Sequence, residues 1–544
     1  MSPRTRHRPS AADLADLLKL AAPIVLIQVG MMLMGVVDTI MVGRLSAVAL
    51  AAVALANLYS FGIMIFGLGV LLGLDPIVSQ ALGARDEEAV GRALQRGLVL
   101  SAVLTVPISL LLTTVEPVLT LAGQPPEVVP LAAGYVYRVL PGVWPFYAFV
   151  VLRQTLQAHR RTAPIVVTIV AANVVNAALN YVLIFGHFGF PELGVLGSAW
   201  ATCISRWVMA LQLLALGGRH LSAHLRRVAP HVLDPKPLGR MLWIGAPIGA
   251  QMMLEFGAFA AVALLMGRLG VVEVAAHQVA INLASLTFMV PLGVSSAAAV
   301  IIGHAVGRQD APGVRRAMLA ALLVGAAFMS LTAALFIGAP GRLAALYTSD
   351  AAVLALAAVL LPIAGVFQIF DGLQVVSLGL LRGLGDTRVP MIVNVVGFWC
   401  CGIPASLVLG FGVDLGAVGL WWGLVLGLAA VAAILVLRLR HRASRELVRV
   451  VIDDRPVPAA QAGRARSHPQ RGARLETTGA SASAGASAPI EQVDVAQPAL
   501  VENEVSAELP RRAVVGPIFD RGRADDVCGA EHAAGSDRHR RDLP

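Results

Sequence analysis

The sequence predicts an all-α integral membrane protein, with twelve transmembrane helices arranged in two six-helix lobes. Three observations predict this fold. Hydrophobic residues make up 57% of the chain and charged residues only 14%, whereas soluble domains contain about 25% charged residues. The apolar runs are continuous over about 20 residues, which is the length that a helix needs to cross a bilayer. Finally, the second half of the chain repeats the first.

The apolar runs favour helices over strands. In hydrocarbon an unpaired backbone group costs several kcal/mol, so only helices and closed barrels span it, and barrel strands would alternate in polarity. The first run extends from Leu20 to Val42, too long for a cleaved signal peptide, so we expect a retained helix. The expected helices lie at roughly 16–42, 48–74, 94–114, 132–154, 163–186, 194–217, 240–266, 275–302, 315–338, 352–381, 388–411 and 415–438.

Basic residues are distributed unevenly between the two sides of this topology. The connections on one side hold most of them, while the opposite connections hold only Arg44, Arg268 and Arg342. By the positive-inside rule, both termini face the cytoplasm of a bacterial cell, with the helices in its inner membrane. The net charge of +9 is then mainly a topology signal, and we expect no nucleic-acid partner.

An internal repeat divides the chain. Ala22-Pro23-Ile24 recurs as Ala246-Pro247-Ile248, an offset of 224 positions, and the same offset aligns Gly83 with Gly307. Each half contains an even number of helices, so the halves are parallel repeats related by an axis along the membrane normal, which is typical of transporters. The predicted domains are an N-lobe at 1–220, a C-lobe at 221–440 and a disordered cytoplasmic tail at 441–544.

Enzymatic and ATP-driven functions have no candidate residues. The two lysines, Lys19 and Lys236, do not follow a glycine as in a phosphate-binding loop. The sequence shows neither a metal-binding His/Glu cluster nor a nucleophile motif. We therefore expect no enzyme, no ATPase partner and no cofactor, only a coupling ion. The lack of catalytic motifs and the internal repeat both argue against an integral membrane enzyme or scaffold.

Three acidic residues fall inside predicted helices: Asp38, Glu255 and Asp371. A charge at mid-membrane costs at least about 2.5–3.5 kcal/mol, so each is a functional hypothesis; the alternative is a carboxylate paired with arginine or capping a broken helix. Asn176 and Asn180 share one helix face, which suits either a site or interhelical hydrogen bonds. Arg206 is either a counter-ion or a side chain that reaches the membrane interface.

Several segments together resemble the multidrug and toxic compound extrusion (MATE) family. They are D-T-I-M-V-G-R-L at 38–45, P-E-L-G-V-L-G-S-A at 191–199, V-A-A-H-Q-V-A-I-N at 274–282 and L-L-R-G-L-G-D-T at 380–387. The pair Glu255 and Asp371 looks most like the NorM branch, and the resemblance spans roughly 14–440. It implies two six-helix lobes around a V-shaped cavity, and antiport of a cation against an organic drug.

The resemblance also implies site residues. Asp38, Asn176 and Asn180 match the ion and proton site of the N-lobe, and Glu255 and Asp371 match the cation site of the C-lobe, where they would bind Na⁺. We further assign Gln28, Phe367 and Gln278 to the substrate cavity; some NorM-type members have tyrosine where Phe367 stands.

The predicted function is secondary active multidrug efflux. A monomer in the lipid bilayer would export small organic drugs or dyes, often cationic, in exchange for Na⁺ or H⁺, and either ion fits the residues. The alternative is a lipid-linked saccharide flippase of the wider superfamily. A flippase would need basic residues for a pyrophosphate, whereas the charge inside these helices is mainly acidic.

Overall fold

The structure is a computed structural model that describes residues 9–225 and 231–453. Most of the expected tail, 454–544, lies outside the described residues. All described helices belong to one compact unit, Met1–Ala459. Twelve of them, counting broken helices once, are long and apolar enough to cross a membrane, and no strand occurs in the described ranges. The predicted all-α class and number of spans are confirmed.

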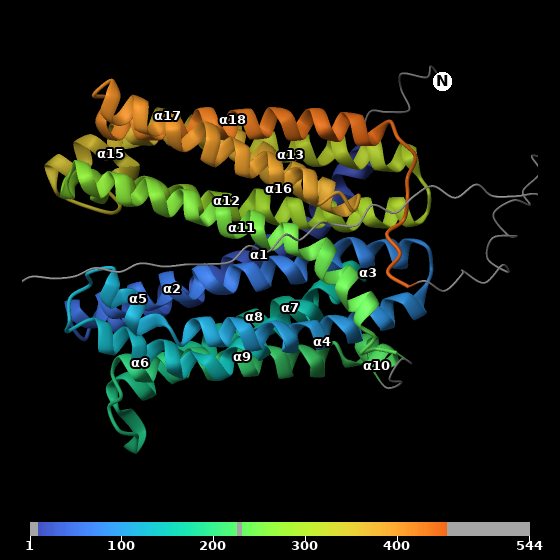
Figure 1. The fold of residues 1–544 in the computed structure, drawn as a ribbon, viewed down its shortest axis with the longest axis horizontal. Coiled ribbons are helices and arrows are strands. Elements are labelled where there is room, and N and C mark those ends of the chain that lie inside the picture. The colour runs from blue at the N-terminus through green and yellow to red at the C-terminus, as the bar shows by residue number, and fades with distance from the viewer. Residues whose placement is uncertain (1–8, 226–230, 454–544) are drawn as a thin grey trace, which may run out of the picture. The chain divides into compact units, whose positions relative to one another are not determined.

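Each predicted span overlaps one observed span (Figure 1). The spans of the first half are α1 (Ala11–Val42), α2 and α3 (Ala47–Leu72 and Leu74–Gly83), α4 (Glu87–Leu112), α6 and α7 (Val129–Val139 and Val143–Ala158), α8 (Ala163–Phe185) and α9 (Val195–Leu216). Those of the second half are α11 (Pro235–Leu269), α12 (Val271–Gly307), α13 (Ala311–Gly338), α15 (Ala351–Gly383), α16 and α17 (Arg388–Val395 and Ile403–Leu407) and α18 (Gly416–Ala443). Three short helices were not predicted: α5 (Val115–Leu121), α10 (Gly218–Leu225) and α14 (Pro340–Ala344).

Some helices begin or end farther out than hydropathy predicts. The helix expected from residue 94 begins at Glu87, where Asp86 caps it by accepting from a backbone N–H. The span expected to end at residue 74 continues past a break at Gly73 into α3. Hydropathy does not detect the polar first and last turns of a helix. These turns are nevertheless helical because of capping and backbone hydrogen bonds.

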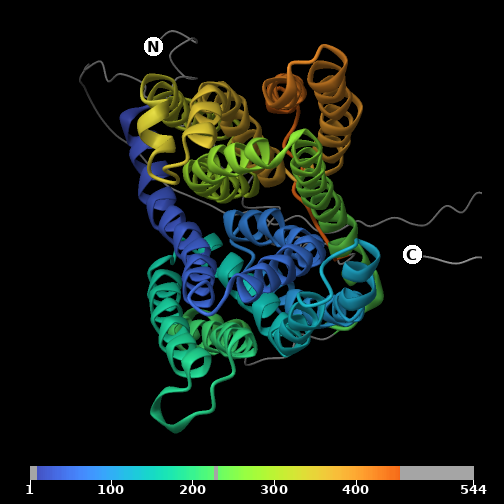
Figure 2. The same cartoon turned by 90° about the vertical axis from the view of Figure 1, so that its left-hand side faces the viewer.

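The first helix of each half packs against both halves. In α1, Leu17 lies in a core formed with α12, α13 and α15, whereas Ile27 lies in the core of the first half. In α11, Met241 lies in the first-half core and Val262 in a second-half core. Both helices can be followed from one bundle to the other in Figure 2. Each carries a proline between these positions, at the pair that the repeat aligns, Pro23 and Pro247.

The contact between the halves is duplicated. A Cβ on Gly69 of α2 would lie 2.5 Å from the Cα of Gly249 in α11. A Cβ on Gly293 of α12 would likewise lie 3.0 Å from the Cα of Val25 in α1. The offset of 224 relates Gly69 to Gly293 and Val25 to Gly249. The same close backbone contact therefore occurs twice with the roles of the halves exchanged, as expected for parallel repeats.

The loop after α3 and the loop after α12 also repeat one geometry. Arg85 and Gln309, related by the offset of 224, both adopt a left-handed backbone, with φ of 60° and 59°, which is uncommon for residues other than glycine. Asp86 and Asp310 follow them, and each accepts a hydrogen bond from a backbone N–H of the next helix, at 3.0 and 2.8 Å. The duplication thus extends to individual turns.

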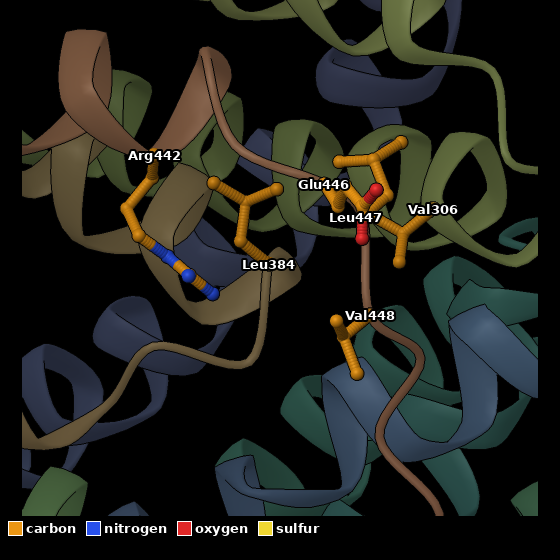
Figure 3. A pocket seen from close by; sticks show the side chains of 6 residues that line it. All are labelled: Val306, Leu384, Arg442, Glu446, Leu447 and Val448. Atoms are coloured by element: carbon orange, nitrogen blue, oxygen red, sulfur yellow. The ribbon is translucent and has the colours of Figure 1, made fainter.

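The end of the bundle at which α1 begins and α18 ends, called the terminal end, carries a segment that joins the halves. This segment, the strap, comprises residues 444–453 and follows α18. Arg449 pairs with Asp86 at 2.9 Å, and the Val450 N–H donates to Gln80 Oε1 at 2.7 Å. Ile452 is buried in the first-half core. Figure 3 shows Glu446, Leu447 and Val448 of the strap beside Leu384 of the second half. The tail expected from 441 therefore begins with described, packed residues.

The strap ends in an ion-pair cluster. Asp453 lies 2.7 Å from Arg92 Nε and 2.6 Å from Arg96 Nη1. Partial burial alone would raise the pKa of Asp453, but the hydrogen bonds and positive charges of Arg96 and Arg92 outweigh it and lower the pKa below its usual range. The charged form of Asp453 is therefore the form that holds the strap to α4.

We expect a bulky side chain at the crossing of α2 and α11 to destabilise the fold. Gly249→Leu should cost about 1–3 kcal/mol by overpacking and lower the midpoint of thermal unfolding in detergent. Gly35→Leu is the matched control, because a Cβ at Gly35 meets nothing within 4 Å. Equal midpoints for the two variants would contradict the importance of this contact.

The strap should detach in acid. Because the pKa of Asp453 is lowered by folding, its stabilising contribution is complete above the ordinary pKa of about 3.9 and is lost as pH falls through the lowered value. With the exposed Cys400 and Cys401 replaced by serine, a spin label on Val448→Cys should be less mobile at neutral pH than in acid. In Asp453→Asn it should be mobile throughout, while Glu446→Gln, an exposed strap carboxylate that forms no ion pair with a described residue, should match the wild type. A label whose mobility ignores both pH and Asp453→Asn would refute this.

Candidate ion-coupling sites

In the first half, Asp38 of α1 lies in a buried cluster of polar side chains. Its carboxylate accepts hydrogen bonds from Asn180 Nδ2 at 2.5 Å and from Thr202 Oγ1 at 2.9 Å. Asn180 Nδ2 also lies 3.2 Å from Asn176 Oδ1, one turn away on α8. Asp38 is 3% exposed and both asparagines are fully buried. The structure thus brings together the three residues assigned to this half and adds Thr202; their role in coupling stays a prediction.

This cluster contains polar atoms that find no partner. Asn176 Nδ2 and Asn180 Oδ1 are buried and form no hydrogen bond with the described residues. An unsatisfied buried amide atom costs about 1–3 kcal/mol. A cation entering the cluster would relieve the cost at Asn180 Oδ1, because this atom and the Asp38 carboxylate are both oxygen ligands for a hard cation.

Arg206 of α9 is not the direct counter-ion of Asp38. Its guanidinium lies 5.2 Å from the ring centroid of Phe146, and Nη1 lies 3.9 Å from Met64 Sδ. No ion pair between Arg206 and a carboxylate forms within the described part of the chain. Its charge is instead stabilised by an aromatic face.

In the second half, Glu255 of α11 is held by two amides from other helices. Its Oε1 accepts from Gln374 Nε2 of α15 at 3.2 Å, and its Oε2 accepts from Asn394 Nδ2 of α16 at 3.0 Å. Gln374 Nε2 also lies 3.1 Å from Asn394 Oδ1, so the two amides orient each other. Glu255 therefore joins three helices, and Gln374 and Asn394 are polar site residues that the sequence analysis did not select.

Asp371 of α15 has a different environment. It is 8% exposed, yet it forms no hydrogen bond or ion pair with any residue that the structure describes. Its electrostatic partner is Glu255, a group of the same charge. Repulsion between two carboxylates is relieved when a proton or a cation binds to one or both of them. A proton or a cation can therefore bind to these carboxylates and leave again without competition from an arginine.

None of the three intramembrane carboxylates forms an ion pair with arginine or lysine in the described ranges. Nor does any of them cap a helix: Asp38, Glu255 and Asp371 all lie inside α1, α11 and α15. The structural alternatives considered from the sequence thus find no support in the geometry. Asp38 and Glu255 instead accept hydrogen bonds from neutral amides and, at Asp38, from a hydroxyl, whereas Asp371 accepts none from the described residues.

The residues assigned to the substrate cavity lie in three different environments. Gln28 accepts a hydrogen bond from Arg153 Nη1 at 3.1 Å. Gln278 is exposed on α12 and donates to Asn282 at 3.2 Å. Phe367 is 2% exposed and packs edge-on against Phe259. The structure does not bring the three together at one contact, and their role in binding substrate stays a prediction.

A buried ion pair between the halves escaped the sequence analysis. Asp75 of α3 lies 3.4 Å from Arg382 Nε of α15, and both side chains are largely buried. Next to it, Gln80 Nε2 donates to the carbonyl of Gly383 at 2.9 Å. Asp75 and Arg382 lie just beyond the ends of the expected spans 48–74 and 352–381, so the sequence places both in connections. Only an alignment of the two halves in space reveals the pair.

The sequence and the fold of this chain are both similar to those of known transporters. The family model described as MatE matches residues 23–182 and 247–408. A probable multidrug resistance protein NorM of Bradyrhizobium diazoefficiens is 39% identical over 442 residues, covering 80% of this chain and 95% of that protein. The multidrug resistance protein NorM of Burkholderia vietnamiensis is 38% identical over 441 residues, covering 79% and 94%. A crystal structure of the eukaryotic MATE transporter AtDTX14 has a TM-score of 0.74 at 24% identity and covers 79% of this chain and 97% of that one.

Removing one partner of the Asp75–Arg382 pair should be costly. Asp75→Asn leaves a buried guanidinium without its counter-charge, for which we expect a loss of about 3–5 kcal/mol. The control is Glu88→Gln. Glu88 lies 3.3 Å from Arg92, and the Glu88 side chain is 90% exposed. Such exposed ion pairs contribute about 0–1 kcal/mol. Thermal unfolding of the purified protein measures both, and an Asp75→Asn loss no larger than that of Glu88→Gln would contradict the expectation.

Proposed function

Because this chain belongs to the MATE family, we propose that it exports organic cations from a bacterial cell in exchange for Na⁺ or H⁺, with the intramembrane carboxylates as the coupling groups. The chain is a multidrug efflux transporter and a multi-pass membrane protein, and its substrates are small molecules. The cationic cargo, the coupling ion and the assignment of residues are the parts that we propose. We place the protein in the inner membrane with both termini in the cytoplasm, on the distribution of basic residues. We further propose that it acts as a monomer.

The observation that carries the proposal is the pair Glu255 and Asp371. The two carboxylates repel each other electrostatically, and within the described ranges only neutral side-chain amides donate hydrogen bonds to them. Such a site favours a positive charge, whether Na⁺ held by carboxylate and amide oxygens or a proton shared by the carboxylates. An inorganic cation and a protonated or quaternary drug would both be attracted, although they need not bind at the same atoms.

Coupling requires that ion binding distinguishes two arrangements of the halves. The first helix of each half is suited to transmit the effect of ion binding from one half to the other. Asp38 lies in the part of α1 that packs with the first half, while Leu17 of the same helix lies in a second-half core. Glu255 lies on α11, which likewise packs with both halves. A change in the charge of either carboxylate thus acts on a helix that both halves share.

The flippase alternative is not favoured by the comparisons, and the geometry gives a physical reason against it. Buried basic residues near the contact between the halves are already engaged. Arg382 pairs with Asp75, and Arg153 donates to Gln28. An anionic pyrophosphate would have to displace these partners, whereas the unpaired charge of the second-half site is negative.

Dye transport into everted membrane vesicles tests the proposal. A fluorescent cationic dye is added outside, and the lumen is loaded with Na⁺ at fixed pH or acidified at fixed Na⁺. Uptake driven by Na⁺ should fall at least about tenfold in Asp371→Asn, which is ~1.4 kcal/mol of coupling. Uptake driven only by the pH gradient and lost in Asp38→Asn would instead identify a proton antiporter that uses the first-half site.

The control is Asp350→Asn, an exposed carboxylate that caps α15 through Oδ1 at 2.9 Å. Asparagine is as good a cap as aspartate, so transport should be unchanged. Uptake that responds to neither gradient, or wild-type uptake in both Asp38→Asn and Asp371→Asn, would overturn the proposal. Protein amount in the vesicles is matched by immunoblot so that insertion is not mistaken for coupling.

A further inference from the structure

Three residues that are distant in the sequence meet at the terminal end of the bundle. Glu87 is the first residue of α4, His159 follows the last residue of α7, and His224 lies on α10. One side-chain ligand atom from each lies within 4.8 Å of the other two. The sequence analysis found no His/Glu cluster because more than a whole helix separates these residues along the chain, and only the fold brings them together.

The spacing within this cluster suits a first-row metal ion. His224 Nε2 lies 3.5 Å from Glu87 Oε2. Two ligands at about 2.0–2.2 Å from a tetrahedral Zn²⁺ are separated by a similar distance. The two imidazole rings are stacked, with centroids 5.7 Å apart and planes inclined by 28°. Two histidines and one carboxylate form a ligand set that proteins use for zinc, and it leaves a fourth position for water.

The surroundings hold the histidines in place. The ring atom His159 Nε2 is buried and forms no hydrogen bond with the described residues. Gln95 donates to the carbonyl of His224 at 2.5 Å and fixes α10 against α4. Beneath the ring of His224 lies Gly91, where a Cβ would come within 3.4 Å of Nδ1. His159 thus has a buried ring nitrogen without a described partner and offers a ligand atom close to those of His224 and Glu87, an arrangement that a metal ion would satisfy.

We propose that Glu87, His159 and His224 form a binding site for a divalent transition-metal ion of the zinc class. The site is separate from the intramembrane carboxylates and lies on other helices. A bound ion would link the start of α4, the end of α7 and α10. Since α10 follows α9, the last span of the first half, the ion would fasten the start of the connection between the halves to the first half.

Metal binding to the purified full-length protein tests this inference directly. Zn²⁺ is titrated into the protein in detergent in competition with a metal-sensitive dye, and Co²⁺ serves as a spectroscopic probe of nitrogen ligation. We expect one ion per chain in the wild type and an affinity at least about tenfold lower, or ~1.4 kcal/mol, in His159→Ala, His224→Ala and Glu87→Gln. His224→Cys should restore binding, because a thiolate is a zinc ligand.

The matched control is His441→Ala, an exposed histidine near the end of α18 that is not part of the cluster. It should bind Zn²⁺ like the wild type. Glu87 has an exposed side chain, so Glu87→Gln remains informative if a histidine variant fails to fold, as checked by gel filtration. Binding by His159→Ala and Glu87→Gln equal to the wild type, or a loss in His441→Ala as large as theirs, would overturn the site.

Discussion

The close backbone contact between the halves is the constraint on which the rest of the structure depends. In lipid, apolar side chains gain little by leaving one apolar environment for another, so helices associate through close packing and polar contacts. Gly69 and Gly249 permit that packing on one side of the molecule, and Gly293 and Val25 on the other. Because the contact is duplicated, α1 and α11 both extend from one half of the molecule to the other. Each then contributes to the cores of both halves.

The intramembrane carboxylates illustrate how charge is tolerated in such a fold. Arginine partners would neutralise Asp38 and Glu255 permanently, whereas the antiport that we propose needs groups whose charge changes with the bound ion. The chain instead surrounds them with amides and a hydroxyl, which stabilise an anion without adding a fixed positive charge. Arginines are used where a permanent link is wanted, as between Arg382 and Asp75 at the contact of the halves.

The terminal end of the bundle gathers interactions that join segments far apart in the sequence. The strap connects α18 to α3 and α4 through Arg449, Val450 and Asp453. On α4 itself, Glu87 meets the histidines of α7 and α10. Both arrangements fix segments that follow the last span of a half: the strap follows α18, and α10 follows α9. Neither arrangement includes Asp38, Glu255 or Asp371, so protonation of Asp453, or the metal binding that we propose at Glu87, would act apart from the intramembrane carboxylates.

The sequence alone determined the class of fold, the number of spans and the repeat, because hydropathy and a constant offset are properties of the linear chain. It also identified Asp38, Glu255 and Asp371, since a charge within an apolar run is conspicuous wherever the run packs. The tertiary structure alone decided their partners. Thr202, Gln374 and Asn394 are ordinary polar residues until helix packing turns them toward a carboxylate. The same holds for Asp75 with Arg382 and for Glu87 with its histidines: contacts between distant segments depend on how helices cross, and the order of residues along one helix does not contain that information.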